Sequence, residues 1–351
     1  MKKIAVLGDT IASGNVFGIQ RFAYEILREI DRLALSFEVL LVVPEYVTVN
    51  IHFDKIRIIK FGNIKNAFLW RQICFPEFVR KNHCISVDMT LGMPYLGCDV
   101  VCLHDCTYEN YPDNFVTLKE KLKRKSYLIR AKKLTHKAQR IVTVSQHSKE
   151  DLIKYYKISP TKIDIIYNAW QHYERIKADT TILDRFNLRA QSYYFSLGSG
   201  LKHKNLLWIV NAAIKNPECL FVVTGSDKFS NYLSNIGLKD IKNIIYTGYL
   251  ADEEVKGLMT NCKAFIHPAF CEGFGIPPLE ALSCGAEILV SKESCLPEIY
   301  EDAALYLDPY DYEIDMNQFQ EFPSSEKRTR ILNKYSWAIS AQKFIEIINK
   351  I

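Results

Sequence analysis

The chain alternates short apolar runs with helical patterns along most of its length, and this alternation constrains its fold more than any other feature. The runs are rich in β-branched and aliphatic residues, as in parallel strands that are buried on both faces. They are Ile4–Leu7, Val39–Val43, Ile56–Ile59, Val100–Leu103 and Ile141–Val144, and, after residue 190, Tyr193–Leu197, Leu220–Val223, Ile244–Tyr246, Ala264–His267 and Ile288–Val290. We predict an α/β fold with two Rossmann-like units in series.

A polar segment separates the two series of strands. The residues from Asn168 to Leu188 are weakly periodic and contain no convincing strand, and 351 residues exceed what one hydrophobic core usually supports. We predict an N-terminal domain at residues 1–170 and a C-terminal domain at residues 171–335. A last helix, Trp337–Ile348, is expected within residues 336–351.

The N-terminus and the cysteines favour a cytoplasmic protein. The first apolar run ends at Gly8-Asp9 after four residues, too short for a signal peptide, and no stretch approaches the ~20 apolar residues of a membrane span. The ten cysteines include no Cys-x-x-Cys pair, which favours free thiols in a reducing compartment. Cys98, Cys102 and Cys106 recur around His104, but a strand holds side chains at this period too far apart to share a metal ion. We expect these three in the core.

Residues 271–285 carry the strongest functional pattern, Cys-Glu-Gly-Phe-Gly-Ile-Pro-Pro-Leu-Glu-Ala-Leu-Ser-Cys-Gly. Glycines let a backbone approach a ligand closely, and the two prolines suit the first turn of a helix whose N-terminus favours phosphate. Gly285 is a stop signal for that helix. Glu280 is expected in the first helical turn, within reach of ribose hydroxyls, while Glu272 lies upstream in the loop. Together these residues indicate a nucleotide-sugar site.

With this segment the chain resembles the retaining glycosyltransferases of family 4, which have the two-domain GT-B fold. The resemblance implies two Rossmann-like domains whose parallel sheets face across a cleft, with the donor bound by the second domain, the acceptor on the side of the first, and the last helix crossing back. It also implies that Glu272 contacts the transferred sugar and Glu280 the ribose. The backbone that would meet the donor diphosphate is Gly273, Phe274, Gly275 and Ile276.

Other segments extend the resemblance. Gly18, after the first strand, matches the family's glycine-rich loop, and His104-Asp105 matches its His-Asp element, whose histidine lies beside the transferred sugar. The segment from Gly198 to Asn205 resembles the phosphate-binding loop, with Lys204 as the cation and Ser199 where many members carry arginine. Tyr249 is expected near the base. The catalytic candidates are therefore His104, Lys204 and Glu272.

The chain contains no Asp-x-Asp pair, the motif that clamps a metal in the other large glycosyltransferase fold. Lys204, backbone N–H groups and the helix dipole would have to stabilise the leaving diphosphate instead. We therefore expect a nucleoside-diphosphate sugar as donor, no further cofactor and no metal.

Residues 119–140 form a basic segment with ten Lys or Arg against one acidic residue, Glu120. Apolar residues such as Leu122, Leu128 and Leu134 recur at helical spacing. Two interpretations remain open: an ordinary helix with a solvated cationic face, or a peripheral contact with an anionic membrane or a phosphorylated acceptor. Nucleic acid is not expected as a partner, because no known nucleic-acid module is present and the net charge is only +5.

The sequence therefore predicts an enzyme that transfers a hexose, with mannose from GDP-mannose favoured, to a glycan or lipid-linked glycan with retention of configuration. Family analogy suggests the synthesis of a bacterial surface polysaccharide such as lipopolysaccharide, in the cytoplasm or at the inner face of the membrane. Two alternatives remain open. The chain could be a non-catalytic protein that binds a sugar nucleotide or a partner, or a retaining glycosidase, which needs two carboxyl groups ~5 Å apart.

Overall fold

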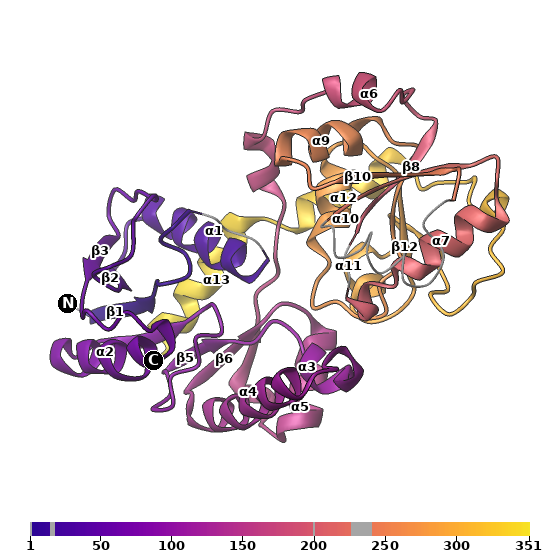
Figure 1. Cartoon of the computed structure of the whole chain (residues 1–351). Coiled ribbons are helices and arrows are strands. Elements are labelled where there is room, and N and C mark those ends of the chain that lie inside the picture. Colours follow the sequence, from indigo (N-terminus) through magenta and orange to yellow (C-terminus); the bar gives the residue numbers. More distant parts are fainter. Residues whose placement is uncertain (1, 15–17, 199–200, 226–240) are drawn as a thin grey trace. The chain divides into compact units, whose positions relative to one another are not determined.

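The computed structural model describes residues 2–14, 18–198, 201–225 and 241–351 (Figure 1). The chain divides into two compact units, residues 1–168 with 337–351, and residues 169–336. Each unit has one parallel β-sheet flanked by helices, as the alternating pattern predicts. The predicted α/β class with two Rossmann-like domains is confirmed.

Among the residues that the structure describes, the sheet of the first unit has seven strands in the order β3-β2-β1-β4-β5-β6-β7, and all these pairings are parallel. The chain order reverses direction between β1 and β4, which is where open α/β sheets bind ligands beyond the carboxyl ends of their strands. The strands are β1 Lys2–Leu7, β2 Phe37–Val43, β3 Arg57–Lys60, β4 Ile85–Asp88, β5 Val100–Cys102, β6 Arg140–Thr143 and β7 Ile163–Ile165.

Helices cover both faces of this sheet. One face forms a hydrophobic core with α2, α4 and α5, while α1 contacts α13 over the other face (Figure 1). The C-terminal helix α13 is therefore part of the first unit, where the Lys2 ammonium donates to the Ile348 carbonyl at 2.9 Å and the Ser340 hydroxyl donates to the Tyr167 carbonyl at 2.7 Å. The helices are α1 Ile19–Arg32, α2 Ala67–Asn82, α3 Thr107–Asn110, α4 Leu118–Lys137, α5 Gln146–Tyr156 and α13 Trp337–Asn349, with the 3-10 turns η1 Pro112–Asn114 and η2 Pro160–Lys162.

Within its described residues, the second unit has six parallel strands in the order β10-β9-β8-β11-β12-β13. They are β8 Tyr193–Leu197, β9 Leu220–Thr224, β10 Ile244–Gly248, β11 Ala264–His267, β12 Ile288–Ser291 and β13 Leu305–Leu307. The helices in the part of this unit that the structure describes are α6 Thr181–Arg185, α7 Leu206–Lys215, α9 Asp252–Asn261, α10 Ile276–Ser283, α11 Leu296–Tyr300 and α12 Ser325–Lys334, with the 3-10 turns η3 Gln171–Arg175, η4 Lys202–Lys204 and η5 Met316–Gln318.

Three strands are absent from the sequence prediction, namely β4, β7 and β13. Each has only three or four residues, and polar residues such as Asp88 and Asp164 interrupt the apolar runs that identify the longer strands. Each of these segments pairs with a neighbouring strand, and this pairing stabilises a strand conformation that its own sequence does not predict.

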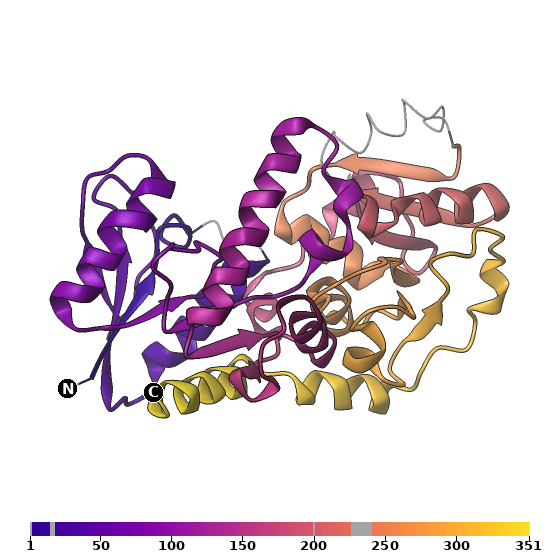
Figure 2. The same ribbon diagram turned by 90° about the horizontal axis from the view of Figure 1, so that it is seen from below.

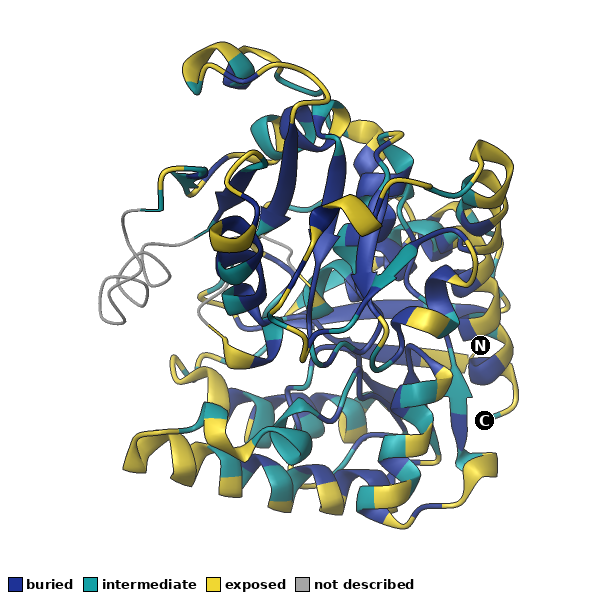
Figure 3. Ribbon diagram, turned by 90° about the vertical axis from the view of Figure 1, so that its right-hand side faces the viewer, coloured by how far each residue is buried: buried dark blue, intermediate teal, exposed yellow. Residues whose placement is uncertain are grey.

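Buried residues line the strands of both units, while exposed residues lie on the outer sides of the helices (Figure 3). All ten cysteines are free thiols, and Cys98, Cys102 and Cys106 are buried, as expected for core residues. Burial raises the pKa of the Cys98 and Cys102 thiols well above the usual value. Within the described residues, no helix is both long enough and apolar enough to cross a bilayer.

Candidate active site

The loop between β11 and α10 is the centre of the candidate site in the second unit. The strand β11 ends at His267, and α10 begins at Ile276 with two prolines in its first turn. Gly275 caps this helix with a φ of 80°, a conformation that favours glycine. A Cβ at this position would lie 2.7 Å from Leu296 Cδ2, so the turn also needs the absence of a side chain.

Three ionisable side chains from separate segments meet in this loop. Lys204 Nζ, from η4 beyond β8, lies 2.5 Å from Glu272 Oε1, and His267 Nε2 lies 2.7 Å from the same oxygen. The side chains of Glu272 and His267 are only 12% and 8% exposed, whereas that of Lys204 is 29% exposed. Lys204, the cation predicted to bind phosphate, and Glu272, the carboxylate predicted to bind the sugar, therefore belong to one cluster.

The charge state of Glu272 follows from this cluster. Burial alone would raise the pKa of the carboxyl, but the Lys204 charge and the hydrogen bonds from His267 and Lys204 outweigh burial and hold the pKa well below its usual value. Glu272 is thus ionised at neutral pH. A buried carboxylate in this state can accept hydrogen bonds from sugar hydroxyls.

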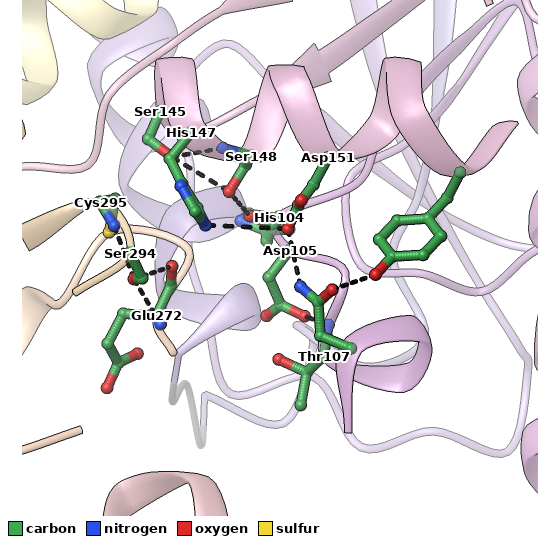
Figure 4. A network of polar contacts seen from close by, with 12 residues as sticks. His104, Asp105, Thr107, Ser145, His147, Ser148, Asp151, Glu272, Ser294 and Cys295 are labelled. Atoms are coloured by element: carbon green, nitrogen blue, oxygen red, sulfur yellow. Dashed lines mark hydrogen bonds and ion pairs between the residues drawn. The ribbon is translucent and has the colours of Figure 1, made fainter. Parts of the chain in front are cut away.

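Ser294 holds the backbone of Glu272. Its hydroxyl accepts from the Glu272 N–H at 2.9 Å and donates to the Glu272 carbonyl at 3.1 Å (Figure 4). The same oxygen accepts from the Cys295 N–H at 2.6 Å. The loop conformation that presents Glu272 is therefore tied to the segment that follows β12.

The second carboxylate, Glu280, is placed differently from the sequence prediction. It is the fifth residue of α10 and lies in the second helical turn, because the helix begins at Ile276 and not at the prolines. His172 Nε2, from η3, lies 2.7 Å from Glu280 Oε1, and the side chains are 0% and 13% exposed. His172 belongs to the polar segment predicted as a linker, and nothing in its local sequence marks it as part of a site.

His104 lies in the first unit, two residues beyond β5. The residue is 6% exposed, and burial lowers the pKa of its imidazole, so the ring is neutral at pH 7. His104 Nε2 is 3.3 Å from the Met89 carbonyl, and the rings of Phe22 and His104 pack nearly perpendicular to each other at 4.8 Å between centroids. Phe22 is one turn after Gly18, whose φ of 50° marks the start of α1, so both predicted residues of this unit lie at one end of that helix.

The polar network of the first unit continues from His104 into α5 (Figure 4). The Ser148 hydroxyl donates to the His104 carbonyl at 3.0 Å and lies 3.0 Å from the Ser145 hydroxyl. The Asp105 carboxylate accepts from the Thr107 N–H at 2.8 Å and closes a short side-chain turn just before α3. Hydrogen bonds to α5 and to the first residue of α3 thus hold the loop that follows β5.

The other predicted donor-site residues that the structure describes lie in the same unit as Glu272. Phe274 is buried and packs edge-on against Tyr335 at 5.3 Å between ring centroids. Tyr249 follows β10 and is 76% exposed, so a stacking surface is accessible there. Ser199 lies outside the described residues. Sequence reasoning missed His267 and His172, the two histidines that contact the paired carboxylates.

The chain is similar to several known proteins. Residues 183–336 match the family model for glycosyl transferases group 1, and residues 94–170 match that for glycosyltransferase family 4. The chain is 26% identical to the O-antigen chain mannosyltransferase RfbU of Salmonella typhimurium over 62% of its own length, and 30% identical to the O-antigen chain mannosyltransferase B of Escherichia coli over 50%. The matches span only 59% and 49% of those two relatives. The fold is similar to that of sucrose-phosphate synthase from Thermosynechococcus elongatus, with a TM-score of 0.77, 14% identity, and coverage of 100% of this chain and 99% of that one.

Proposed function

This chain belongs to the glycosyltransferases of family 4, and we propose that it transfers a hexose from a nucleoside-diphosphate sugar to a hydroxyl of a glycan or lipid-linked glycan. Mannose from GDP-mannose is the favoured donor, because two similar proteins are O-antigen chain mannosyltransferases. We assign the reaction to the synthesis of a bacterial surface polysaccharide.

The observation that carries this proposal is the Lys204–Glu272–His267 cluster beside the start of α10. A sugar nucleotide needs a cation for its diphosphate and acceptors for the hydroxyls of its sugar and ribose. Lys204 supplies the cation, Glu272 accepts from the sugar, and Glu280 accepts from the ribose. The helix dipole at Ile276 adds positive potential where the diphosphate would lie.

The same residues suggest how the reaction proceeds. The bond between the anomeric carbon and the diphosphate oxygen breaks, and the acceptor oxygen bonds to that carbon from the face that the diphosphate leaves, which preserves the configuration. The acceptor hydroxyl gives up its proton to the departing diphosphate oxygen. Lys204 stabilises the charge that develops on the leaving diphosphate, so the chemistry proceeds without a metal. From the family resemblance we expect His104 beside the sugar, where its neutral ring would act by hydrogen bonding.

Thermal stability of the purified protein tests the donor site. A nucleotide that binds only the folded state raises the melting temperature. We expect a shift with GDP or GDP-mannose, and none or less with UDP, ADP and dTDP compounds, all without added metal. Glu280→Ala and Lys204→Ala should abolish it. Glu253→Ala, an exposed acidic residue at the start of α9, is the matched control and should keep it.

The absence of any shift at millimolar nucleotide would contradict the donor-site assignment. If a donor is found, the anomeric configuration of the product, read by nuclear magnetic resonance, tests retention. Full biological activity of Glu272→Ala would instead favour a non-catalytic binding protein.

The proposed acceptor also suggests where the protein works. A lipid-linked glycan is presented at a membrane, and the basic residues 119–140 suit a peripheral contact with its inner, cytoplasmic face. We therefore propose a cytoplasmic location at that surface.

A further inference from the structure

The helix α4 has two apolar stripes on opposite sides. Its inner stripe, with Tyr127, Ala131 and Leu134, is buried in the core of the first unit. Leu118, Leu122 and Ile129 lie on the opposite side at helical spacing and are 75%, 59% and 56% exposed. A helix that only covers a sheet needs the first stripe alone. The outer stripe leaves three large side chains in water without a structural role in the unit.

Lysines border the outer stripe on both sides, namely Lys119, Lys121, Lys125, Lys132 and Lys133, and all are exposed. Within the described part of the chain, none of these five forms an ion pair with a carboxylate. The only acidic residue of α4, Glu120, is used at the helix start, where its side chain accepts from the N–H groups of Val116 and Thr117. The positive charge around the stripe is therefore uncompensated within this helix.

The surface continues from α4 onto α2, which lies beside it on the same face of the sheet (Figure 2). Arg130 lies over the Phe68 ring at 5.6 Å, and Lys133 lies over the Tyr95 ring at the same distance. Phe68 is 41% exposed and Tyr95 is 40% exposed. Ile73 and Leu96, both more than half exposed, line a shallow pocket next to them. Apolar and cationic side chains thus alternate over two helices and a loop.

We propose that this surface, with Phe68, Ile73, Leu96, Leu118, Leu122 and Ile129 as its apolar residues, docks on the anionic phospholipid headgroups of a bilayer. Lysines can extend toward headgroup phosphates while the apolar side chains between them enter the boundary with the acyl chains. Charge complementarity selects an anionic membrane over a neutral one. A binding site for nucleic acid would not need the outer aliphatic stripe.

The proposal that this surface docks on a membrane rests on the proposed function only for the membrane location, and it does not depend on the identity of the donor. The test uses the full chain and vesicles of phosphatidylcholine, with or without phosphatidylglycerol, in a sedimentation assay. The first variant is Lys121→Gln, Lys125→Gln and Lys132→Gln combined. The control, Lys177→Gln, Lys242→Gln and Lys350→Gln combined, changes exposed lysines elsewhere by the same charge.

We expect the wild type and the control to bind the anionic vesicles and not the neutral ones. A cation near an anionic surface is worth about fivefold in partitioning, so the loss of three lysines should weaken binding about 100-fold. A second variant, Leu122→Gln with Ile129→Gln, should reduce the binding that remains at high salt, because salt screens the charges but not apolar burial. Both changes are on exposed positions, and an unchanged melting temperature should verify that each variant folds.

Several outcomes would overturn the proposal. The wild type could fail to bind anionic vesicles, or the control could lose as much binding as the first variant. A change in oligomeric state with Leu122→Gln and Ile129→Gln, seen by size-exclusion chromatography, would identify a self-association face instead. Donor binding, read by the nucleotide-dependent melting shift, should stay unchanged in every variant, which separates a failure of this proposal from a failure of the transferase proposal.

Discussion

At the scale of single residues, each of the carboxylates of Glu272 and Glu280 contacts a histidine outside residues 271–285. His267 contacts Glu272 and His172 contacts Glu280, in both cases at 2.7 Å from one carboxylate oxygen. Such a contact orients the carboxylate and leaves its other oxygen for a ligand. The histidines therefore act as positioning residues if the carboxylates bind the donor.

His172 offers the clearer test, because it lies away from the predicted sugar and diphosphate contacts. His172→Ala should weaken nucleotide binding about fivefold, the worth of one ordinary hydrogen bond, with kcat nearly unchanged. Titration calorimetry with the nucleotide measures the effect. His172→Gln can still donate to Glu280 and should restore much of the affinity, whereas His52→Ala, at an exposed position of the first unit, should have no effect. Equal affinities for His172→Ala and the wild type would refute the positioning role.

At the scale of elements, α10 lies between two glycines that have nearly equal φ angles but different surroundings. Gly275 has a φ of 80° and Gly285 has a φ of 82°. A Cβ at Gly275 would collide with Leu296, while a Cβ at Gly285 would have nothing within 4 Å. Backbone strain alone costs about 1–2 kcal/mol for alanine in this region.

We expect Gly275→Ala to lower the free energy of unfolding by more than Gly285→Ala, by about 1–3 kcal/mol, because the collision adds to the same backbone strain. Gly275→Ala should also weaken nucleotide binding, since it moves the start of α10. Denaturant unfolding and nucleotide titration of both variants measure this. Similar losses of stability and affinity in the two variants would show that the Leu296 contact relaxes and that the helix start is not part of the site.

At the scale of the whole molecule, the chain leaves the first unit after Asn168 and returns to it at Trp337. The last helix, α13, buries Trp337, Phe344 and Ile348 in that unit. The first unit is therefore assembled from both ends of the sequence, while Lys204, Glu272 and Glu280, the residues proposed to bind the donor, belong to the continuous segment between them.

Phe344→Ala should consequently destabilise the first unit by about 3–5 kcal/mol and leave the donor site intact. Calorimetry should show an unfolding transition at a lower temperature than in the wild type. Below that temperature, nucleotide affinity should stay within about twofold of the wild type, which is less than the 1.4 kcal/mol that corresponds to a tenfold change. Ile339→Ala, at a 55% exposed position of the same helix, is the matched control and should change little. A large loss of nucleotide affinity in Phe344→Ala would contradict this division.

The sequence by itself determined the α/β class, the two series of parallel strands, and the segment with Glu272, Gly275 and Glu280. These features are local, because apolar runs, turn residues and helix signals act over a few positions of the chain. The short strands β4, β7 and β13 needed the tertiary structure, since neighbouring strands complete their hydrogen bonding.

Only the tertiary structure decided which side chains meet at the candidate site. Lys204 and Glu272 are separated by 68 residues and His172 and Glu280 by 108, and no local pattern encodes such contacts. Strand order brings the ends of β8 and β11 together, and packing of η3 against α10 brings in His172. Local sequence therefore selects the elements, whereas the partners of each carboxylate depend on how the elements pack.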